Sequence, residues 1–123
     1  MPIMEISIVP IGTKSPSVSK YVAISEKTLK RCKGLNSKIT AMGTLIEADS
    51  LSTLFDAAAR MHESVLASGA RRVLTHIAID ERLDKKSGIR EKVASVKRKV
   101  NCIPQRTKVR GLPANGEARL RRL

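Results

Sequence analysis

Hydrophobic and polar residues alternate over residues 2–11 and again over residues 71–80, where Val73, Thr75, Ile77 and Ile79 fall on one side. Alternation with a period of two is typical of a strand with one buried face. Residues 39–48 have the same character, with a turn or bulge at Met42-Gly43 between two short strands. The pattern therefore predicts four strands.

Three other segments repeat apolar residues at helical spacing. The first predicts a helix over about residues 16–33, with Ser15 as N-cap, Pro16 as first helical residue and Gly34 as C-cap. The second helix begins after Asp49 or Ser50 and ends at Gly69, and a third, shorter one covers residues 89–100. The apolar faces of the first two helices comprise Val18, Tyr21, Val22, Ser25, Leu29 and Cys32, and Leu51, Leu54, Phe55, Ala58, His62, Val65 and Leu66.

The predicted order is β-α-β-β-α-β, which is the arrangement of an α+β, ferredoxin-like fold. Both main helices then cover one face of a four-stranded sheet, and the other face stays open. In the first strand, Glu5, Ser7 and Val9 alternate with Met4, Ile6 and Ile8, so one of these two sets points away from the helices. An open face with Val and Ile among its residues favours a homo-oligomer.

Charge divides the chain unevenly. Residues 1–84 contain 11 Lys or Arg and 9 Asp or Glu, a net charge of +2, whereas residues 85–123 contain 13 and 2, a net charge of +11. The apolar pattern ends at about Asn101, and Pro and Gly become frequent. We therefore predict one folded domain over residues 1–100 and a disordered basic tail over residues 101–123.

Composition narrows the chemistry. Cys32 and Cys102 stand far apart, and His62 and His76 do not share a helical face, so we expect a buried thiol, with Cys32 on the apolar face of a helix, and no metal site. Apolar segments are short and broken by charges, which predicts a cytoplasmic protein without a membrane span. No nucleophile elbow, phosphate-binding loop or paired acid motif is present, and His62-Glu63 point in different directions on a helix. We therefore expect no enzyme and no catalytic residue.

Several separate blocks occur in an order and spacing that resemble a known family. They are Ser7–Ala23, Met42-Gly43-Thr44-Leu45-Ile46-Glu47, His62-Glu63, Arg72-Val73-Leu74-Thr75 and Ile79–Lys85. Over residues 1–100 the chain resembles the small, single-domain thiamine-binding-protein-like family of archaea, bacteria and fungi. The resemblance implies the ferredoxin-like architecture, a homodimer or homotetramer, and thiamine or its hydroxymethylpyrimidine moiety as ligand. It implies no cofactor besides this ligand.

Thiamine needs a paired donor and acceptor for its aminopyrimidine and a carboxylate or a ring of oxygens for its cationic thiazolium. The acids that lie in or beside predicted strands are Glu5, Glu47 and Asp80. Neutral hydrogen bonds and a soft apolar contact would come from Ser7, Thr13, Met42 and Thr44, with Thr75 as a further hydroxyl. The resemblance places the pocket where the turn after the first strand meets residues 43–47, within one chain or at a subunit boundary.

Simpler interpretations stand beside these. Glu47 would equally form an ion pair with Arg72 or a lysine, Glu5 would be exposed or bridge subunits, and Asp80 would begin a solvated charged loop. His62 is expected as a hydrogen-bonded core or interface residue. The alternative function is nucleic-acid binding through the basic tail, although the strands carry no aromatic residue on which a base could stack. A purely structural oligomer is the third alternative.

Overall fold

The computed structural model describes residues 1–102, so the predicted tail lies outside the described residues except for its first two positions. Residues 1–89 form one compact unit, and the chain from Arg90 onward belongs to a second. The elements are β1 (Ile3–Pro10), α1 (Ser19–Lys30), β2 (Leu35–Ile39), β3 (Thr44–Ala48), α2 (Leu51–Ala67), β4 (Val73–Asp80) and α3 (Ile89–Cys102).

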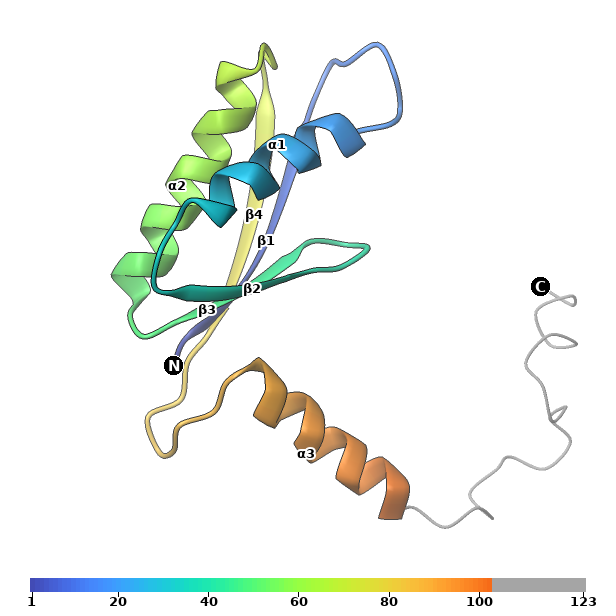
Figure 1. The fold of residues 1–123 in the computed structure, drawn as a ribbon. Coiled ribbons are helices and arrows are strands. Elements are labelled where there is room, and N and C mark those ends of the chain that lie inside the picture. Colours follow the sequence, from blue (N-terminus) through green and yellow to red (C-terminus); the bar gives the residue numbers. More distant parts are fainter. Residues whose placement is uncertain (103–123) are drawn as a thin grey trace, which may run out of the picture. The chain divides into compact units, whose positions relative to one another are not determined.

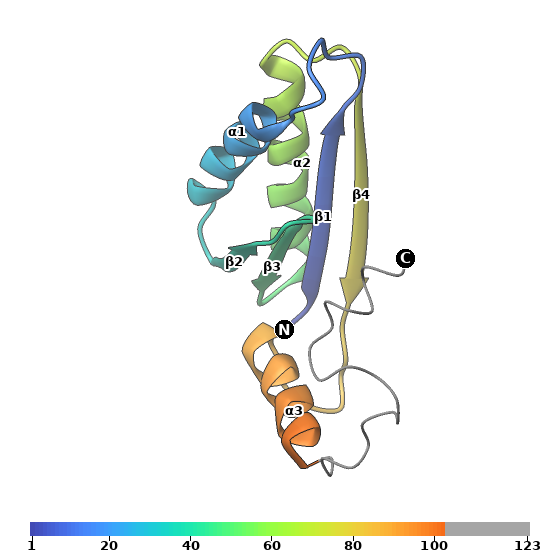
Figure 2. The ribbon, with the colours of Figure 1, turned by 90° about the vertical axis from the view of Figure 1, so that its right-hand side faces the viewer.

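The first unit has the predicted α+β, ferredoxin-like arrangement. Its four strands form one antiparallel sheet in the order β2-β3-β1-β4. Figure 2 shows α1 and α2 on the same side of this sheet. Burial alternates along β1 as expected, because Met4 and Ile6 point to the helices and Glu5 and Val9 are exposed on the opposite, open face.

The core between sheet and helices is aliphatic. Its fully buried members include Met4 and Ile6 from β1, Ile46 from β3, and Leu54 and Met61 from α2. One aromatic residue departs from expectation, since Phe55 is 50% exposed rather than part of the core. The buried stripe of α2 runs through Leu54, Ala57, Ala58, Met61 and Val65, and Phe55 lies one helical position beyond its edge.

Helix α1 begins at Ser19 and ends at Lys30 with Arg31 as C-cap, so the predicted start at Pro16 with a Ser15 cap and the predicted C-cap at Gly34 are wrong. The Ser15 hydroxyl instead accepts a hydrogen bond from the Ser17 amide (3.1 Å) and closes a bend before the helix. Val18 occupies the N-cap position without a side-chain cap. Local bonding of serine to its own neighbours competes with capping, which explains the shift.

The remaining elements agree more closely with their predicted bounds. Ser50 caps α2 by accepting from the Thr53 amide at 3.2 Å, as predicted. The β2–β3 hairpin begins earlier than expected, at Leu35, and its turn covers residues 40–43. His62 lies half-buried with Nδ1 2.6 Å from the Thr75 hydroxyl, which fits the hydrogen-bonded histidine that its position predicted.

Helix α3 extends two residues past the predicted boundary, to Cys102. Its apolar residues Val93, Val96 and Val100 recur on one side, and all three are exposed. Within residues 1–102, the structure contains no helix with the length and hydropathy required to span a membrane.

Candidate functional site

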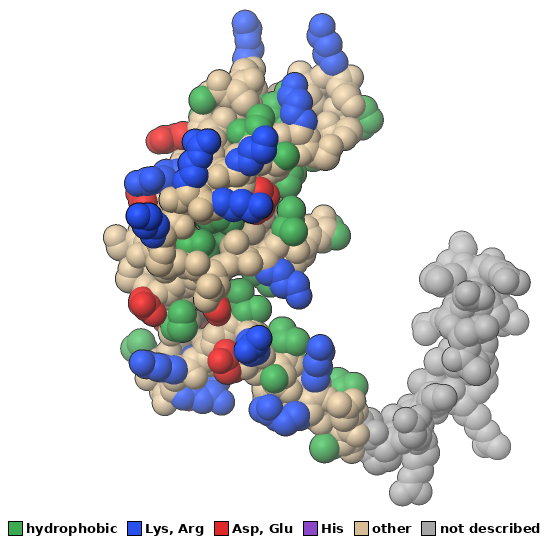
Figure 3. All heavy atoms as spheres, viewed as in Figure 1, with side chains coloured by type: hydrophobic (Ala, Val, Ile, Leu, Met, Phe, Trp, Pro, Cys, Tyr) green, Lys and Arg blue, Asp and Glu red, His purple; other side chains and the backbone are tan. Residues whose placement is uncertain are grey.

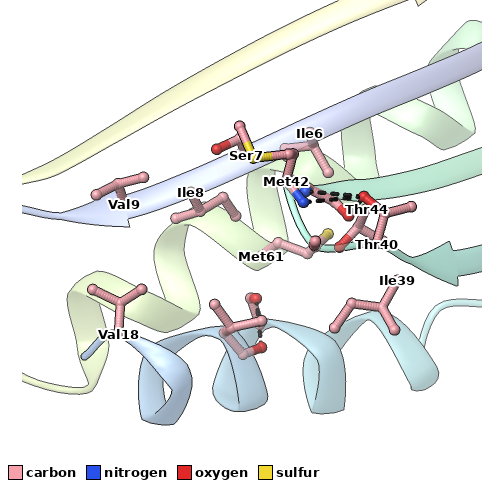
Figure 4. Close-up of a pocket in the computed structure, with 14 residues that line it drawn as sticks. Ile6, Ser7, Ile8, Val9, Val18, Ile39, Thr40, Met42, Thr44 and Met61 are labelled. Atoms are coloured by element: carbon pink, nitrogen blue, oxygen red, sulfur yellow. Dashed lines mark hydrogen bonds between the residues drawn. The ribbon is translucent and has the colours of Figure 1, made fainter. Parts of the chain in front are cut away.

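A hollow of about 220 Å³ opens within the first unit, between β1, α1 and the turn of the β2–β3 hairpin (Figure 4). Strand β1 supplies four consecutive residues, and the hairpin supplies six more, from Ile39 to Thr44. The lining consists of Ile6, Ser7, Ile8, Val9, Val18, Val22, Ser25, Ile39, Thr40, Ala41, Met42, Gly43, Thr44 and Met61. Most of these side chains are apolar.

The hollow exists because the hairpin leaves β1 partway along its length. Pairing between β1 and β3 runs only from Ile3 to Ile6, whereas pairing between β1 and β4 continues to Pro10. Figure 1 shows the hairpin crossing β1 at an angle while β1 and β4 continue together. The second half of β1 therefore has β4 on one side and the hollow on the other.

The hairpin turn is held by Thr40. Its hydroxyl donates to the Gly43 carbonyl oxygen (2.7 Å) and accepts from the amides of Met42 and Gly43. Gly43 also touches β1, because a methyl group added there would lie 2.9 Å from the Ile6 carbonyl oxygen. Only glycine therefore permits this close approach of the turn to β1 without a shift of the backbone.

Two further hydroxyls of the hollow are engaged within the protein. Ser25 is buried and donates to the Val22 carbonyl oxygen (2.8 Å), a local bond within α1. Thr44 is buried and donates a short hydrogen bond to Glu26 Oε1. The carboxylate of Glu26, from α1, is thus fastened to a residue of the lining.

Three of the predicted site residues, Ser7, Met42 and Thr44, line the hollow. Met42 is 84% exposed at the hairpin turn. Thr13 lies in the loop after β1 and donates to the Ser15 carbonyl oxygen (2.9 Å), and it is not part of the lining.

The three predicted acids lie elsewhere. Glu5, Glu47 and Asp80 occur on adjacent strands, and the strand register places Ile3 opposite both Glu47 and Asp80. The side chains of Glu47 and Asp80 therefore lie on the open face with that of Glu5, and none of the three acids lines the hollow. His76, opposite Ser7, also lies exposed on that face.

Glu47 is held by two neighbours. Its Oε1 accepts from Asn36 Nδ2 (3.4 Å) and its Oε2 from the backbone amide of Ile89 (2.7 Å). Among residues 1–102, ion pairs join Asp56 to Arg60 and Arg82 to Asp84, and neither of them joins Glu47 to Arg72, its expected partner. Through these two hydrogen bonds, the carboxylate of Glu47 connects the segment after β4 to the β2–β3 hairpin.

Sequence reasoning missed Glu26. One signal was available, because residues 11–38 contain seven Lys or Arg and Glu26 is their single acid. Figure 3 shows Lys and Arg side chains along α1, so the carboxylate lies in basic surroundings. An isolated acid in such a helix favours a local role, here the bond to Thr44.

One exposed pair has a perturbed titration. Arg82 Nε donates to Asp84 Oδ1 at 2.6 Å, and a second guanidinium nitrogen donates to Oδ2. This hydrogen bonding lowers the pKa of Asp84 to about 2 and raises the pKa of Arg82. The pair closes the loop after β4 and lies outside the lining of the hollow.

Relatives and solved structures are consistent with this fold. A protein of Methanothermobacter thermautotrophicus, named only as an UPF0045 protein, is 44% identical over 96 residues, which cover 78% of this chain and 96% of that protein. The crystal structure of hypothetical protein MJ1052 from Methanocaldococcus jannaschii superposes with a TM-score of 0.71 at 36% identity, covering 78% and 95% of the two chains.

A third similarity concerns the fold alone. A Thermotoga maritima structure, named as a candidate thiamine biosynthesis or salvage protein, superposes with a TM-score of 0.65 at 16% identity and covers 77% of this chain and 97% of that one. The family model described as "Thiamine-binding protein" matches residues 4–97, which include β1, the hairpin, both main helices and β4. The chain therefore belongs to the thiamine-binding protein family.

Proposed function

We propose that this protein is a non-catalytic, cytoplasmic binding protein for thiamine or its hydroxymethylpyrimidine moiety, and that the hollow beside β1 is its binding site. Family membership supports the ligand class. The observation that carries the assignment to this site is a hollow the size of one ring, with a carboxylate fastened to its lining.

Size favours a single aromatic ring. Pockets for drug-sized ligands enclose about 300–1,000 Å³, and this hollow measures about 220 Å³. The aminopyrimidine would occupy it, with Val18, Val22 and Met61 against the ring faces. The thiazolium would remain outside the hollow, between the exposed Met42 of the hairpin turn and the Glu26 carboxylate of α1, which is bonded to Thr44 of the lining.

The chemistry of the lining supports binding rather than catalysis. Of the described residues that line the hollow, none has a side chain that titrates near neutral pH. General acid–base chemistry on a bound pyrimidine would need such a group within hydrogen-bonding reach. Apolar walls with a few fixed polar atoms are typical of a site that selects a ligand by shape.

The decisive experiment is calorimetric titration of the full chain with thiamine and with hydroxymethylpyrimidine. We expect saturable binding of both ligands that changes little between low and physiological salt. A Val22→Trp variant, which fills the hollow from α1, should abolish binding, and the matched Val93→Trp variant on α3 should bind normally. Absence of heat with both ligands would refute the proposal.

The same titration separates the proposal from nucleic-acid binding. Contacts between a basic segment and phosphates release counterions, so they weaken steeply as salt rises. Binding of an oligonucleotide, with strong salt dependence and no response to either pyrimidine ligand, would instead favour the charge of residues 85–123 as the functional feature.

We also propose that the protein acts as a homodimer or homotetramer. The supporting feature is β4, an edge strand of eight residues. From Val73 to Ile79 it carries no Asp, Glu, Lys or Arg, although such residues commonly protect strand edges from pairing. Leu74, Ile77 and Ile79 are each at least 39% exposed.

A further inference from the structure

On the side that borders the hollow, the backbone of β1 has no paired strand, although β4 pairs with its other side. Three contacts establish which way its backbone groups point. The carbonyl oxygens of Pro2 and Ile6 face β3, since Pro2 O accepts from the Ala48 amide and Ile6 O lies beside Gly43. The Ile11 amide faces the other way and donates to the Arg72 carbonyl oxygen at 2.8 Å, in continuation of the β4 ladder.

Backbone direction alternates along an antiparallel strand, and the N–H and C=O of one residue point to the same side. The backbone N–H and C=O groups of the even-numbered residues of β1 therefore point toward β3, and those of the odd-numbered residues point toward β4. Ile8 is the first even-numbered residue after the β3 ladder ends at Ile6. Its N–H and C=O thus point to the side that β3 has left, and Ile8 lines the hollow there.

Other described residues do not occupy these two groups. The structure records no hydrogen bond of the Ile8 backbone outside the sheet, and β3 offers it no partner within the sheet. The next even-numbered residue is Pro10, which has no N–H to satisfy. A proline at this position accords with a strand edge that lacks a neighbouring strand.

Of the four hydroxyl side chains that line the hollow, all except Ser7 have no hydrogen left to donate. The hydroxyl hydrogens of Ser25, Thr40 and Thr44 are already donated to Val22 O, Gly43 O and Glu26 Oε1. Those hydroxyls retain only acceptor capacity. Ile8 offers a donor and an acceptor side by side, in the geometry that another strand would normally fill.

We infer that the Ile8 backbone recognises the ligand, and this inference rests on the proposed function. The ligand class is a planar heteroaromatic ring with an acceptor nitrogen next to an exocyclic amino group. The ring nitrogen accepts from the Ile8 N–H and the amino group donates to the Ile8 C=O, as a strand edge would. The aminopyrimidine of thiamine has this pattern.

Amide hydrogen exchange followed by NMR tests the inference on the full chain. Without ligand, the Ile8 amide should exchange faster than those of Met4 and Ile6, which face β3 within the ladder. Saturation with hydroxymethylpyrimidine should slow Ile8 exchange at least about tenfold, as expected for a new backbone hydrogen bond. The amides of Ser7 and Val9, directed at β4, should change little.

Ligand analogues and variants supply the second test. Replacing the exocyclic amino group by a methyl group should weaken binding about threefold to tenfold, because one hydrogen bond is lost. Ile8→Pro removes the N–H without breaking the β4 ladder and should weaken binding similarly or more. Its matched control, Ile8→Val, keeps the N–H and should bind within about twofold of the wild-type chain.

The outcomes distinguish this inference from the proposed function. Saturable binding with unchanged Ile8 exchange, or with equal affinity for the methyl analogue, would overturn backbone recognition and leave the site assignment standing. A Val22→Trp chain that binds no ligand, yet exchanges its Ile8 amide as slowly as the ligand-saturated wild-type chain, would overturn it as well. Absence of binding by both pyrimidine ligands would overturn both proposals.

Discussion

Glu26 distinguishes the two halves of the proposed ligand. It is half-buried on α1 and its carboxylate is bonded to the Thr44 hydroxyl beside the hollow. Glu26→Gln keeps a hydrogen-bond acceptor and removes the negative charge. We expect thiamine, which carries the cationic thiazolium, to bind about tenfold more weakly, and neutral hydroxymethylpyrimidine to bind within about twofold of wild type. Calorimetric titration with both ligands measures the two effects.

Glu63→Gln is the matched control, because Glu63 is exposed on α2 and does not line the hollow. It removes the same charge without touching the site, so affinity for thiamine should remain unchanged. Equal losses for both ligands in Glu26→Gln would mean that Glu26 maintains the shape of the hollow and does not attract the thiazolium.

Asp84 provides a pH prediction. Hydrogen bonding from Arg82 lowers its pKa from the ordinary 3.8 to about 2 in the folded chain. A lowered folded-state pKa means that the contribution of the pair to stability is present above about pH 4 and is lost as pH falls through about 2. The pair is exposed to solvent, so its effect on global stability should be small. Carboxyl NMR should give a midpoint near 2 that returns toward 3.8 in Arg82→Gln.

At single positions, local rules predicted some features and failed at others. Ser50 caps α2 because it is extended and directly precedes the helix, and it is one of the two caps that the sequence indicated. Ser15 has the same residue type before a proline, yet its hydroxyl bonds the Ser17 amide. Which of two short-range bonds a serine makes depends on the path of the loop, and that path is set by β1 and α1 together.

At the scale of elements, the β2–β3 turn depends on Gly43. Gly43→Ala would place a methyl group 2.9 Å from the Ile6 carbonyl oxygen. The turn must then shift away from β1, and we expect a loss of about 1–3 kcal/mol in the free energy of unfolding and weaker ligand binding. Thermal unfolding and calorimetry of the variant would measure these effects.

Ala41→Ser in the same turn is the control for Gly43→Ala. Ala41 lines the hollow but is exposed, so a small polar residue there should leave stability unchanged. Wild-type stability and affinity in Gly43→Ala would show that the turn adjusts freely and that its contact with β1 does not shape the site.

The order of the elements was predictable from the sequence, whereas the site was only partly so. Periodicity distinguishes strands from helices locally, and the β-α-β-β-α-β order then allows few topologies. The hollow depends on where the β1–β3 ladder ends, at Ile6. That end point depends on contacts between residues far apart in the sequence. Alternation alone could therefore identify Ser7 and Thr44 as polar residues of the strands, but it could not show that the N–H and C=O of Ile8 are unpaired.

The acids show the same limit. Glu5, Glu47 and Asp80 were singled out because each lies in or beside a strand, but a strand has two faces and the register sends all three to the open one. Glu26 lies on a helix surface, and its place as the single acid of a basic segment indicates a local role without naming a partner. Its significance follows only from the contact of α1 with Thr44, 18 residues away.

For the whole molecule, the uncharged edge of β4 and the open face of the sheet bear on assembly. A second copy could extend the sheet by pairing its own β4 antiparallel to this one, which would satisfy the free backbone groups of both edges. The two strands would bring no charged side chains opposite each other between Val73 and Ile79. We therefore expect the wild-type chain to be a dimer or tetramer by light scattering after size-exclusion chromatography.

Ile77→Lys tests this assembly directly. A two-fold interface places the new lysine near its own symmetry mate, so each dimer gains two like charges and the subunits should separate. Leu83→Lys adds the same charge in the loop after β4, where Leu83 is 94% exposed, and should leave the mass unchanged. If Ile77→Lys keeps the wild-type mass, β4 is not the contact and the open face, with Glu5 and Val9, becomes the surface to mutate next. Retained ligand binding in a monomeric Ile77→Lys protein would further indicate that one chain contains the complete site.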